Sequence, residues 1–250
     1  MNGGSIPDGR RNDARHLTLP DLPFTSAERR IVDTLRTPAA VQTWLNHLPY
    51  NTEQGGGTQR SFRGVVRHGM AHCMEAALSA ATILEQRGYP PLVMSLESID
   101  QLDHVIFVYR GPRGWGSIAR SRDPGLHGRK PVFRRLRDLA LSYVDPYVDL
   151  TGGVRGYGVA DLRTLMDGYD WRLSPKNVWA VEQALIVLPH RAIRTDRVRI
   201  ERLRAKYRAY LATHGRKPIF YDRRRWTPIP ASFVSRGAAA HESAAANKTS

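Results

Sequence analysis

The single cysteine of this 250-residue chain, Cys73, is the residue best suited to covalent chemistry. The alanine-rich stretch over residues 71–87 predicts a helix, which Gly88 and the prolines at 90 and 91 would end. Cys73 therefore lies in the first turn of the predicted helix, where unpaired backbone N–H groups favour the thiolate, the nucleophilic form of cysteine. The sequence predicts an activated thiol, with a buried structural cysteine on an alanine-rich face as the alternative.

A nucleophilic thiolate needs a histidine within hydrogen-bond reach, and that histidine needs an orienting partner. His104 begins the β-branched and aromatic segment 104–110, which we predict to be a strand. The turn at 111–114 then returns the chain as a second strand that begins at Trp115, so the two strands form a hairpin. If Arg110 pairs with Trp115 across the turn, the register of the hairpin identifies the residues opposite His104.

That register predicts two candidates for the orienting partner. Ser121 directly faces His104, and Asp123 is a diagonal neighbour on the same face, because side chains alternate along a strand. Asp103 would point to the opposite face, and Asp100 lies in the preceding turn, so neither is preferred. The catalytic candidates are therefore Cys73 and His104 with Asp123 or Ser121.

The order of these residues and elements resembles a known superfamily. A cysteine at the start of a helix, a histidine about thirty residues later at the start of a strand, and a return strand that begins with tryptophan are similar to the transglutaminase-like superfamily. The core of that superfamily is papain-like. The resemblance covers roughly residues 69–124. Residues 115–123 and the Gly-Leu-His-Gly-Arg run at 125–129 look like its mostly uncharacterised bacterial branch.

The resemblance implies thiol-dependent acyl transfer or hydrolysis on a peptide or amide substrate, with Cys73 matching the nucleophile and His104 the base. The superfamily usually has an aspartate on the return strand, where this sequence has Ser121. A serine orients an imidazole but does not stabilise the imidazolium as a carboxylate does. A catalytically silent fold that acts as a protein- or peptide-binding scaffold is therefore the second hypothesis.

Two other chemistries have weaker support in the sequence. His68, His72 and Cys73 could be interpreted as metal ligands, but Gly69 interrupts the helix that would bring them together. The three glycines at 55–57 lack the lysine and hydroxyl that a phosphate-binding loop requires. We therefore expect neither a metal nor another cofactor.

The formal net charge of +15 raises a third hypothesis, a module that contacts nucleic acid. Of the 38 basic residues 33 are arginine, spread along the chain, so a general arginine bias is preferred. The basic stretch at 194–208 belongs to a predicted helix at 196–214, whose Val198, Leu203, Tyr207 and Tyr210 favour docking on the body with a solvated outer face. The run of three arginines and a tryptophan at 223–226 is interpreted as an exposed turn rather than a site for single strands.

Composition and segment patterns predict an α+β protein without a membrane span. One cysteine excludes an intrachain disulfide framework, and neither a secretory signal nor an apolar run of membrane length is found, so we expect a cytoplasmic location. We divide the chain into a disordered tail (1–24), a transglutaminase-like core with N-terminal helices (25–131), a helical C-terminal extension (132–234) and a second disordered tail (235–250). The other expected elements are a strand at 92–96 and helices at 38–48, 132–148, 159–166, 176–188 and 196–214.

Overall fold

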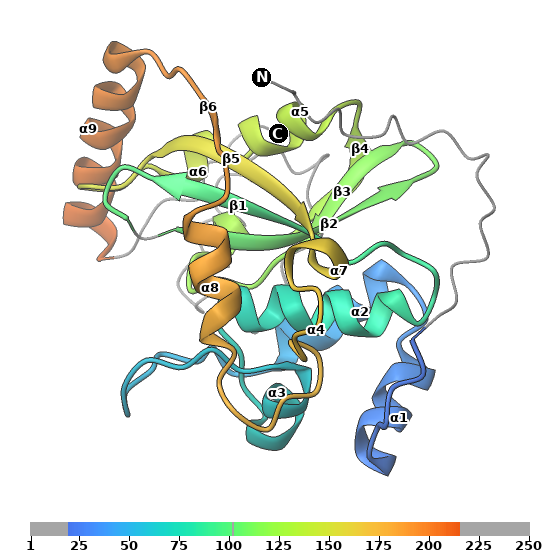
Figure 1. Cartoon of the computed structure of the whole chain (residues 1–250). Coiled ribbons are helices and arrows are strands. Elements are labelled where there is room, and N and C mark those ends of the chain that lie inside the picture. The colour runs from blue at the N-terminus through green and yellow to red at the C-terminus, as the bar shows by residue number, and fades with distance from the viewer. Residues whose placement is uncertain (1–19, 102, 216–250) are drawn as a thin grey trace, which may run out of the picture.

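A computed structural model describes residues 20–215 of the chain, apart from residue 102. In this range the chain folds as a mixed α/β structure, with helices on both faces of a single antiparallel sheet (Figure 1). The strands are β1 (Leu92–Ser98), β2 (His104–Gly111), β3 (Gly114–Ile118), β4 (Arg129–Phe133), β5 (Val154–Asp161) and β6 (Arg191–Ala192). They form a six-stranded sheet in the order β4-β3-β2-β1-β5-β6.

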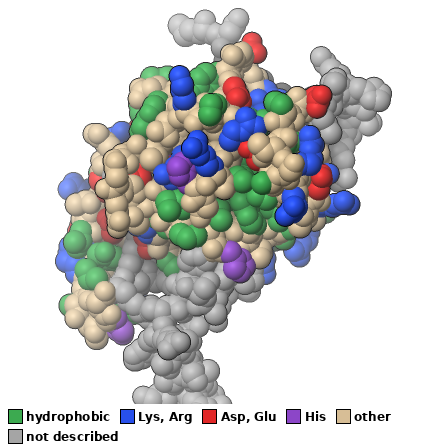
Figure 2. All heavy atoms as spheres, turned by 90° about the horizontal axis from the view of Figure 1, so that it is seen from below, with side chains coloured by type: hydrophobic (Ala, Val, Ile, Leu, Met, Phe, Trp, Pro, Cys, Tyr) green, Lys and Arg blue, Asp and Glu red, His purple; other side chains and the backbone are tan. Residues whose placement is uncertain are grey.

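The helices are distributed along the whole described range. They are α1 (Ser26–Thr34), α2 (Pro38–His47), α3 (Phe62–His68), α4 (Cys73–Glu85), α5 (Leu136–Leu141), α6 (Val144–Tyr147), α7 (Leu162–Leu165), α8 (Trp179–Ile186) and α9 (Arg197–His214). None of these described helices is both long and apolar enough to cross a bilayer. On the face shown in Figure 2, Lys and Arg side chains are scattered among polar and apolar ones rather than aligned in one stripe.

Both faces of the central strands are buried, which explains why β2 is almost continuously apolar. Val105 and Phe107 belong to the core cluster that contains α4, whereas Ile106 and Val108 belong to the cluster that contains residues of α5 and α6. The period of two along the strand sends alternate side chains to the two faces. The strand that begins with His104 is therefore packed between two core clusters, one on each face of the sheet.

The predicted helix at 71–87 is confirmed as α4, and all its residues after Cys73 are buried. Four alanines (Ala76, Ala77, Ala80 and Ala81) have no exposed surface, and small side chains let a helix approach a sheet closely. Gly88 follows the helix with a φ of 79°, the left-handed conformation that glycine adopts without a Cβ clash. The helix is thereby held at both ends, with Cys73 at its first position.

The predicted hairpin of β2 and β3 is confirmed in register. Arg110 pairs with Trp115, and the ladder continues to the pair of Phe107 and Ile118. β3 ends at Ile118, however, so the ladder stops before it reaches His104.

The prediction of a wholly helical region after residue 132 is wrong. β5 lies beside β1 in the sheet, with Leu92 opposite Asp161, and the expected helices at 132–148 and 159–166 are reduced to short pieces. Glycines in β5 interrupt the alternating pattern by which a strand is recognised in a sequence. The packing of the sheet requires one of them, Gly158. A Cβ on Gly158 would lie 2.7 Å from Leu188 Cδ2, closer than carbon atoms pack.

The ends of the chain differ from expectation in two details. Leu22 and Phe24, which we assign to the N-terminal tail, pack against the core. The predicted helix at 196–214 is confirmed as α9, but Val198 is 63% exposed instead of facing the body. The contacts of α9 with the rest of the protein include the ion pair of Arg199 with Asp145, with 2.6 Å between Nη2 and Oδ2. Residues 1–19 of the first tail, the whole second tail and the run at 223–226 lie outside the described residues.

Candidate active site

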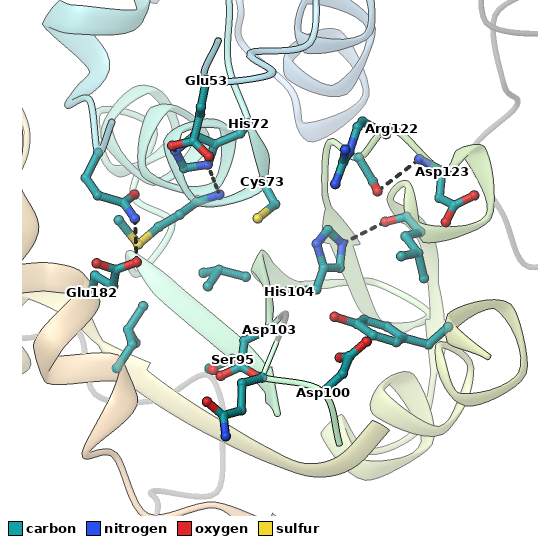
Figure 3. A pocket seen from close by; sticks show the side chains of 18 of the residues that line it. Glu53, His72, Cys73, Ser95, Asp100, Asp103, His104, Arg122, Asp123 and Glu182 are labelled. Carbon is teal, nitrogen blue, oxygen red and sulfur yellow. Dashed lines mark hydrogen bonds and ion pairs between the residues drawn. The ribbon is translucent and has the colours of Figure 1, made fainter. Parts of the chain in front are cut away.

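The four candidate residues from the sequence line one pocket of about 400 Å³. Cys73 comes from the start of α4 and His104 from the start of β2, while Ser121 and Asp123 come from the segment that follows β3. Figure 3 shows Cys73 and His104 directed into the same space from opposite sides. The fold therefore brings together residues that are far apart in the sequence.

The Cys73 thiol is half-buried, and its position favours the thiolate. Burial raises the pKa of this thiol, but hydrogen bonding to His104 and His72 and the charges of these imidazoles lower it by more. The resulting pKa lies well below the usual range of a cysteine. Cys73 also occupies the first position of a 13-residue helix, where the backbone N–H groups point away from the helix and towards an anion.

The His104 ring is held in one tautomer by a main-chain carbonyl. Its Nε2 lies 2.9 Å from the carbonyl oxygen of Leu126, and because a carbonyl only accepts, Nε2 carries the proton. The neutral imidazole then has its lone pair on Nδ1, which is the nitrogen left for the thiol. The ring is 3% exposed, and Tyr143 and Tyr147 lie against it with ring centroids 6.0 and 6.5 Å away.

The predicted orienting partners do not fill that position. Ser121 Oγ accepts a hydrogen bond from the backbone N–H of Asp123 at 3.1 Å, and neither side chain bonds to His104. The reason is that β3 ends at Ile118, after which the chain leaves the sheet and brings Leu126 over the histidine. A backbone carbonyl replaces the carboxylate or serine that the extended register predicts.

Two buried arginines hold the segment that carries Leu126. Arg129 has no exposed surface, donates to the carbonyls of Gly125 and His127, and lies 3.8 Å from the ring centre of Tyr143. Arg120 donates to the carbonyl of Ser121 at 2.9 Å. Burial lowers the pKa of each guanidinium to about 10, which still leaves both charged at neutral pH. Their donors satisfy carbonyls that a buried loop would otherwise leave unpaired.

His72, the second histidine beside the thiol, acts as the N-cap of α4. Its Nδ1 accepts from the backbone N–H of Met74 at 3.3 Å, and its Nε2 lies 2.8 Å from the carbonyl of Thr58. Burial lowers the pKa of His72, but the hydrogen bond and charge of Cys73 and the charge of Glu75 raise it to about 9. Protonation would place a second N–H on Nδ1, against that of Met74, so charging the ring would weaken the cap of α4. With both of its nitrogens engaged, His72 positions the start of α4, whereas His104 keeps one ring nitrogen for the thiol.

Glu75 is the buried acceptor that fastens the loops around the start of α4. Its carboxylate has no exposed surface and accepts from the Asn51 amide, the Thr58 hydroxyl and the backbone N–H groups of Arg60 and His72. The last of these bonds completes a capping box with the N-cap residue. Segments near residues 51, 58 and 72 are thereby held around Cys73.

The wall of the pocket is acidic, although the chain as a whole is basic. Arg122 is the one Lys or Arg among the described lining residues. One of the lining carboxylates, Glu182, accepts from the Gln59 amide at 2.7 Å. The other acidic lining residues are Glu53, Asp100, Asp103, Asp123 and Asp149. Such a wall favours a substrate with positive charge beside the thiol.

Comparison with known proteins does not assign the chain to a family. No protein-family model matches it, and no curated protein matches it. The arrangement of the pocket must therefore carry the functional argument.

The sequence did not reveal three parts of the site: the capping role of His72, the buried acceptor Glu75 and the Leu126 carbonyl. The spacing of His72 and Glu75, with a polar residue three positions before a glutamate, was the available signal for the capping box. Histidine is not among the usual capping residues, so the signal is weak. The alternative interpretation of His68, His72 and Cys73 as metal ligands is wrong, because His72 caps α4 and His68 lines a different pocket. No group among the described residues has the arrangement to hold a metal ion.

Proposed function

We propose that the protein is a thiol-dependent enzyme that cleaves or transfers the acyl group of a peptide or amide substrate. The observation that carries the proposal is the pairing of Cys73, whose thiol pKa is lowered at the N-terminus of α4, with His104, whose tautomer is fixed by Leu126. Nucleophile, base and orienting group are then present in one pocket, which is the arrangement that covalent catalysis by cysteine requires.

The reaction would proceed in two steps through a thioester. The Cys73 thiolate attacks the carbonyl carbon of the amide, and the C–N bond breaks as protonated His104 gives a proton to the leaving amine. The backbone N–H groups at the start of α4 would stabilise the oxyanion. Water or an amine then attacks the thioester while His104 takes up its proton, and the thiolate is released. Water gives hydrolysis, and an amine gives acyl transfer.

The arrangement of elements supports a transglutaminase-like fold with a papain-like core as part of this proposal. The cysteine begins a buried helix, the helix packs on an antiparallel sheet, and the histidine begins a strand of that sheet. The departure from the superfamily pattern is the main-chain acceptor in place of an aspartate. An imidazolium hydrogen-bonded to a carbonyl is less stabilised than one beside a carboxylate, so the expected reaction is slower.

The test is to trap the acyl-enzyme. The full chain is incubated with a mixture of lysine-containing peptide amides, quenched in acid, digested and analysed by mass spectrometry. A thioester adduct on Cys73 that is absent from Cys73→Ala supports the proposal. Adding hydroxylamine before the quench would divert the acyl group to a hydroxamate and separate transfer from hydrolysis.

The scaffold hypothesis predicts a different result in the same experiment. Peptides would bind the unmodified protein and Cys73→Ala with equal affinity, and no adduct would form. That outcome would refute the enzymatic proposal. The Cys73→Ser variant serves as the matched control, because its hydroxyl preserves most of the shape of the pocket without an easily ionised nucleophile.

A further inference from the structure

A second pocket, of about 420 Å³, combines a largely apolar accessible surface with several basic side chains. Its basic lining residues are Arg60, Arg63, Arg67, His68 and Lys176. Among the described residues, no aspartate or glutamate lines it. Thr58 lines this pocket, and its neighbour in the sequence, Gln59, lines the candidate active site. The lining residues of the two pockets therefore carry opposite charge.

Most of the positive charge in this second pocket is not neutralised by the protein itself. Arg63 is paired with Glu28, with Nε 2.7 Å from Oε1. In the part of the chain that the structure describes, Arg67, His68 and Lys176 make no ion pair, and their side chains are exposed at the pocket. The pocket thus carries an excess of cationic donors that could meet an anion.

Arg60 is the residue that points most directly to a ligand. Its side chain is 16% exposed, its Nε lies 3.9 Å from Glu75, and its Nη1 is buried without a hydrogen-bond partner in the described structure. Buried polar groups are normally hydrogen-bonded, so the unpaired Nη1 of an arginine that lines the pocket indicates a missing acceptor.

The chain keeps Arg60 in place at a cost to local helix stability. Gly64 lies inside the short helix α3, where glycine is unfavourable. A Cβ at position 64 would lie 2.8 Å from the Cβ and 3.3 Å from the Cγ of Arg60, so only glycine leaves room for the arginine stem. The backbone therefore leaves room for the aliphatic stem of Arg60 beside α3.

The two walls of the pocket are also joined before any ligand arrives. Ser61 Oγ donates to the carbonyl of Ser174 at 2.7 Å, and the backbone N–H of Gln59 donates to Asn177 Oδ1 at 3.1 Å. These bonds fix Lys176 relative to α3. A site whose walls are already ordered binds its ligand with a smaller loss of conformational entropy.

We propose that this second pocket binds a small molecule that carries a phosphate or diphosphate group. A guanidinium group can donate two parallel hydrogen bonds to two oxygens of one phosphate. The lysine and the histidine add positive charge that does not depend on such a paired geometry. The volume is that of a small-molecule site, whereas a nucleic-acid strand would need an extended groove. This inference is independent of the proposed thiol chemistry.

The test is calorimetric titration of the full chain with inorganic pyrophosphate at constant ionic strength. We expect one saturable site, with the affinity weakened about tenfold or more in Arg60→Gln and in Arg67→Gln. Arg134→Gln is the matched control, because Arg134 is exposed, lies outside the pocket and makes no ion pair among the described residues. It should bind like the unmodified protein.

A further variant separates position from charge. Gly64→Ala keeps every cationic group but displaces Arg60, and it should weaken binding while circular dichroism shows an intact fold. The proposal is overturned if no saturable binding is found, if Arg134→Gln weakens binding as much as the pocket variants, or if citrate binds as tightly as pyrophosphate. Tighter binding of a short single-stranded DNA at the same residues would also overturn it.

Discussion

Replacing His104 with alanine should remove most of the ionisation of the Cys73 thiol near pH 6. His104 is the largest of the influences that lower this pKa, while burial acts in the opposite direction. Without the imidazole the pKa of the thiol should move back towards the ordinary cysteine value of about 8.5, at which only about 0.3% is thiolate at pH 6. The unmodified protein, with its lowered pKa, should hold a larger fraction of thiolate there.

The rate of alkylation by iodoacetamide reports this difference, because the thiolate is the reacting form. A thiolate of lower pKa is intrinsically less nucleophilic, so the loss of rate at pH 6 should be roughly 10- to 100-fold rather than the full ratio of thiolate fractions. The rate of the unmodified protein should change less between pH 6 and 8 than that of the alanine variant. The rate of the alanine variant should rise about tenfold per pH unit over the same interval.

The matched control is His47→Ala, which removes an exposed histidine from α2, outside the pocket. It should alkylate like the unmodified protein. If His104→Ala reacts at pH 6 within twofold of the unmodified protein, the thiolate does not depend on His104, and the assignment of a Cys73–His104 pair fails.

Three further predictions concern the support of the site and its charge. Arg129→Leu should destabilise the fold by about 2–4 kcal/mol in urea denaturation, because it leaves the carbonyls of a buried loop unpaired; a loss below about 0.5 kcal/mol would contradict this role. Burial, with the charges of nearby arginines, lowers the pKa of His127 to about 4, below its unfolded value near 6.5. The folded state thus favours the neutral His127 ring. The stability that this preference contributes is fully present above pH 6.5 and is lost as the pH falls towards 4. By calorimetry, the unmodified protein should lose up to about 3 kcal/mol over this interval relative to His127→Asn, and parallel curves would contradict the shift. Finally, Glu182→Gln should lower kcat/KM about three- to tenfold for a cationic peptide amide and leave a neutral one unchanged; equal effects on both would show that the carboxylate does not select charge.

The parts of the fold that sequence reasoning found are those fixed by local pattern. The helix of Cys73 is marked by alanines and by a glycine at its end, and the hairpin is marked by apolar strands around a Gly-Pro-Arg-Gly turn. In each case the sequence pattern, and the hydrogen bonds that it predicts, involve residues close together in the chain. The same holds for α9, which Asp196 and Gly215 delimit.

The parts that were missed depend on contacts between distant segments. β5 contains Gly156 and Gly158, which weaken a strand pattern but let residues 188–190 approach the sheet. The acceptor for His104 could not be identified from side-chain types, because every residue except proline offers the same main-chain groups. The prediction that Ser121 faces His104 assumed that pairing continues beyond Ile118, but the ladder ends there.

The main-chain oxygen of Leu126 has a consequence for how this site tolerates mutation. An orienting aspartate is lost by one codon change, whereas every residue that follows the same backbone path at position 126 presents the same acceptor. An alanine scan would therefore report a two-residue site and leave the third partner invisible. Replacing the peptide linkage after Leu126 with an ester, which weakens the oxygen as an acceptor, is the alteration that would expose it.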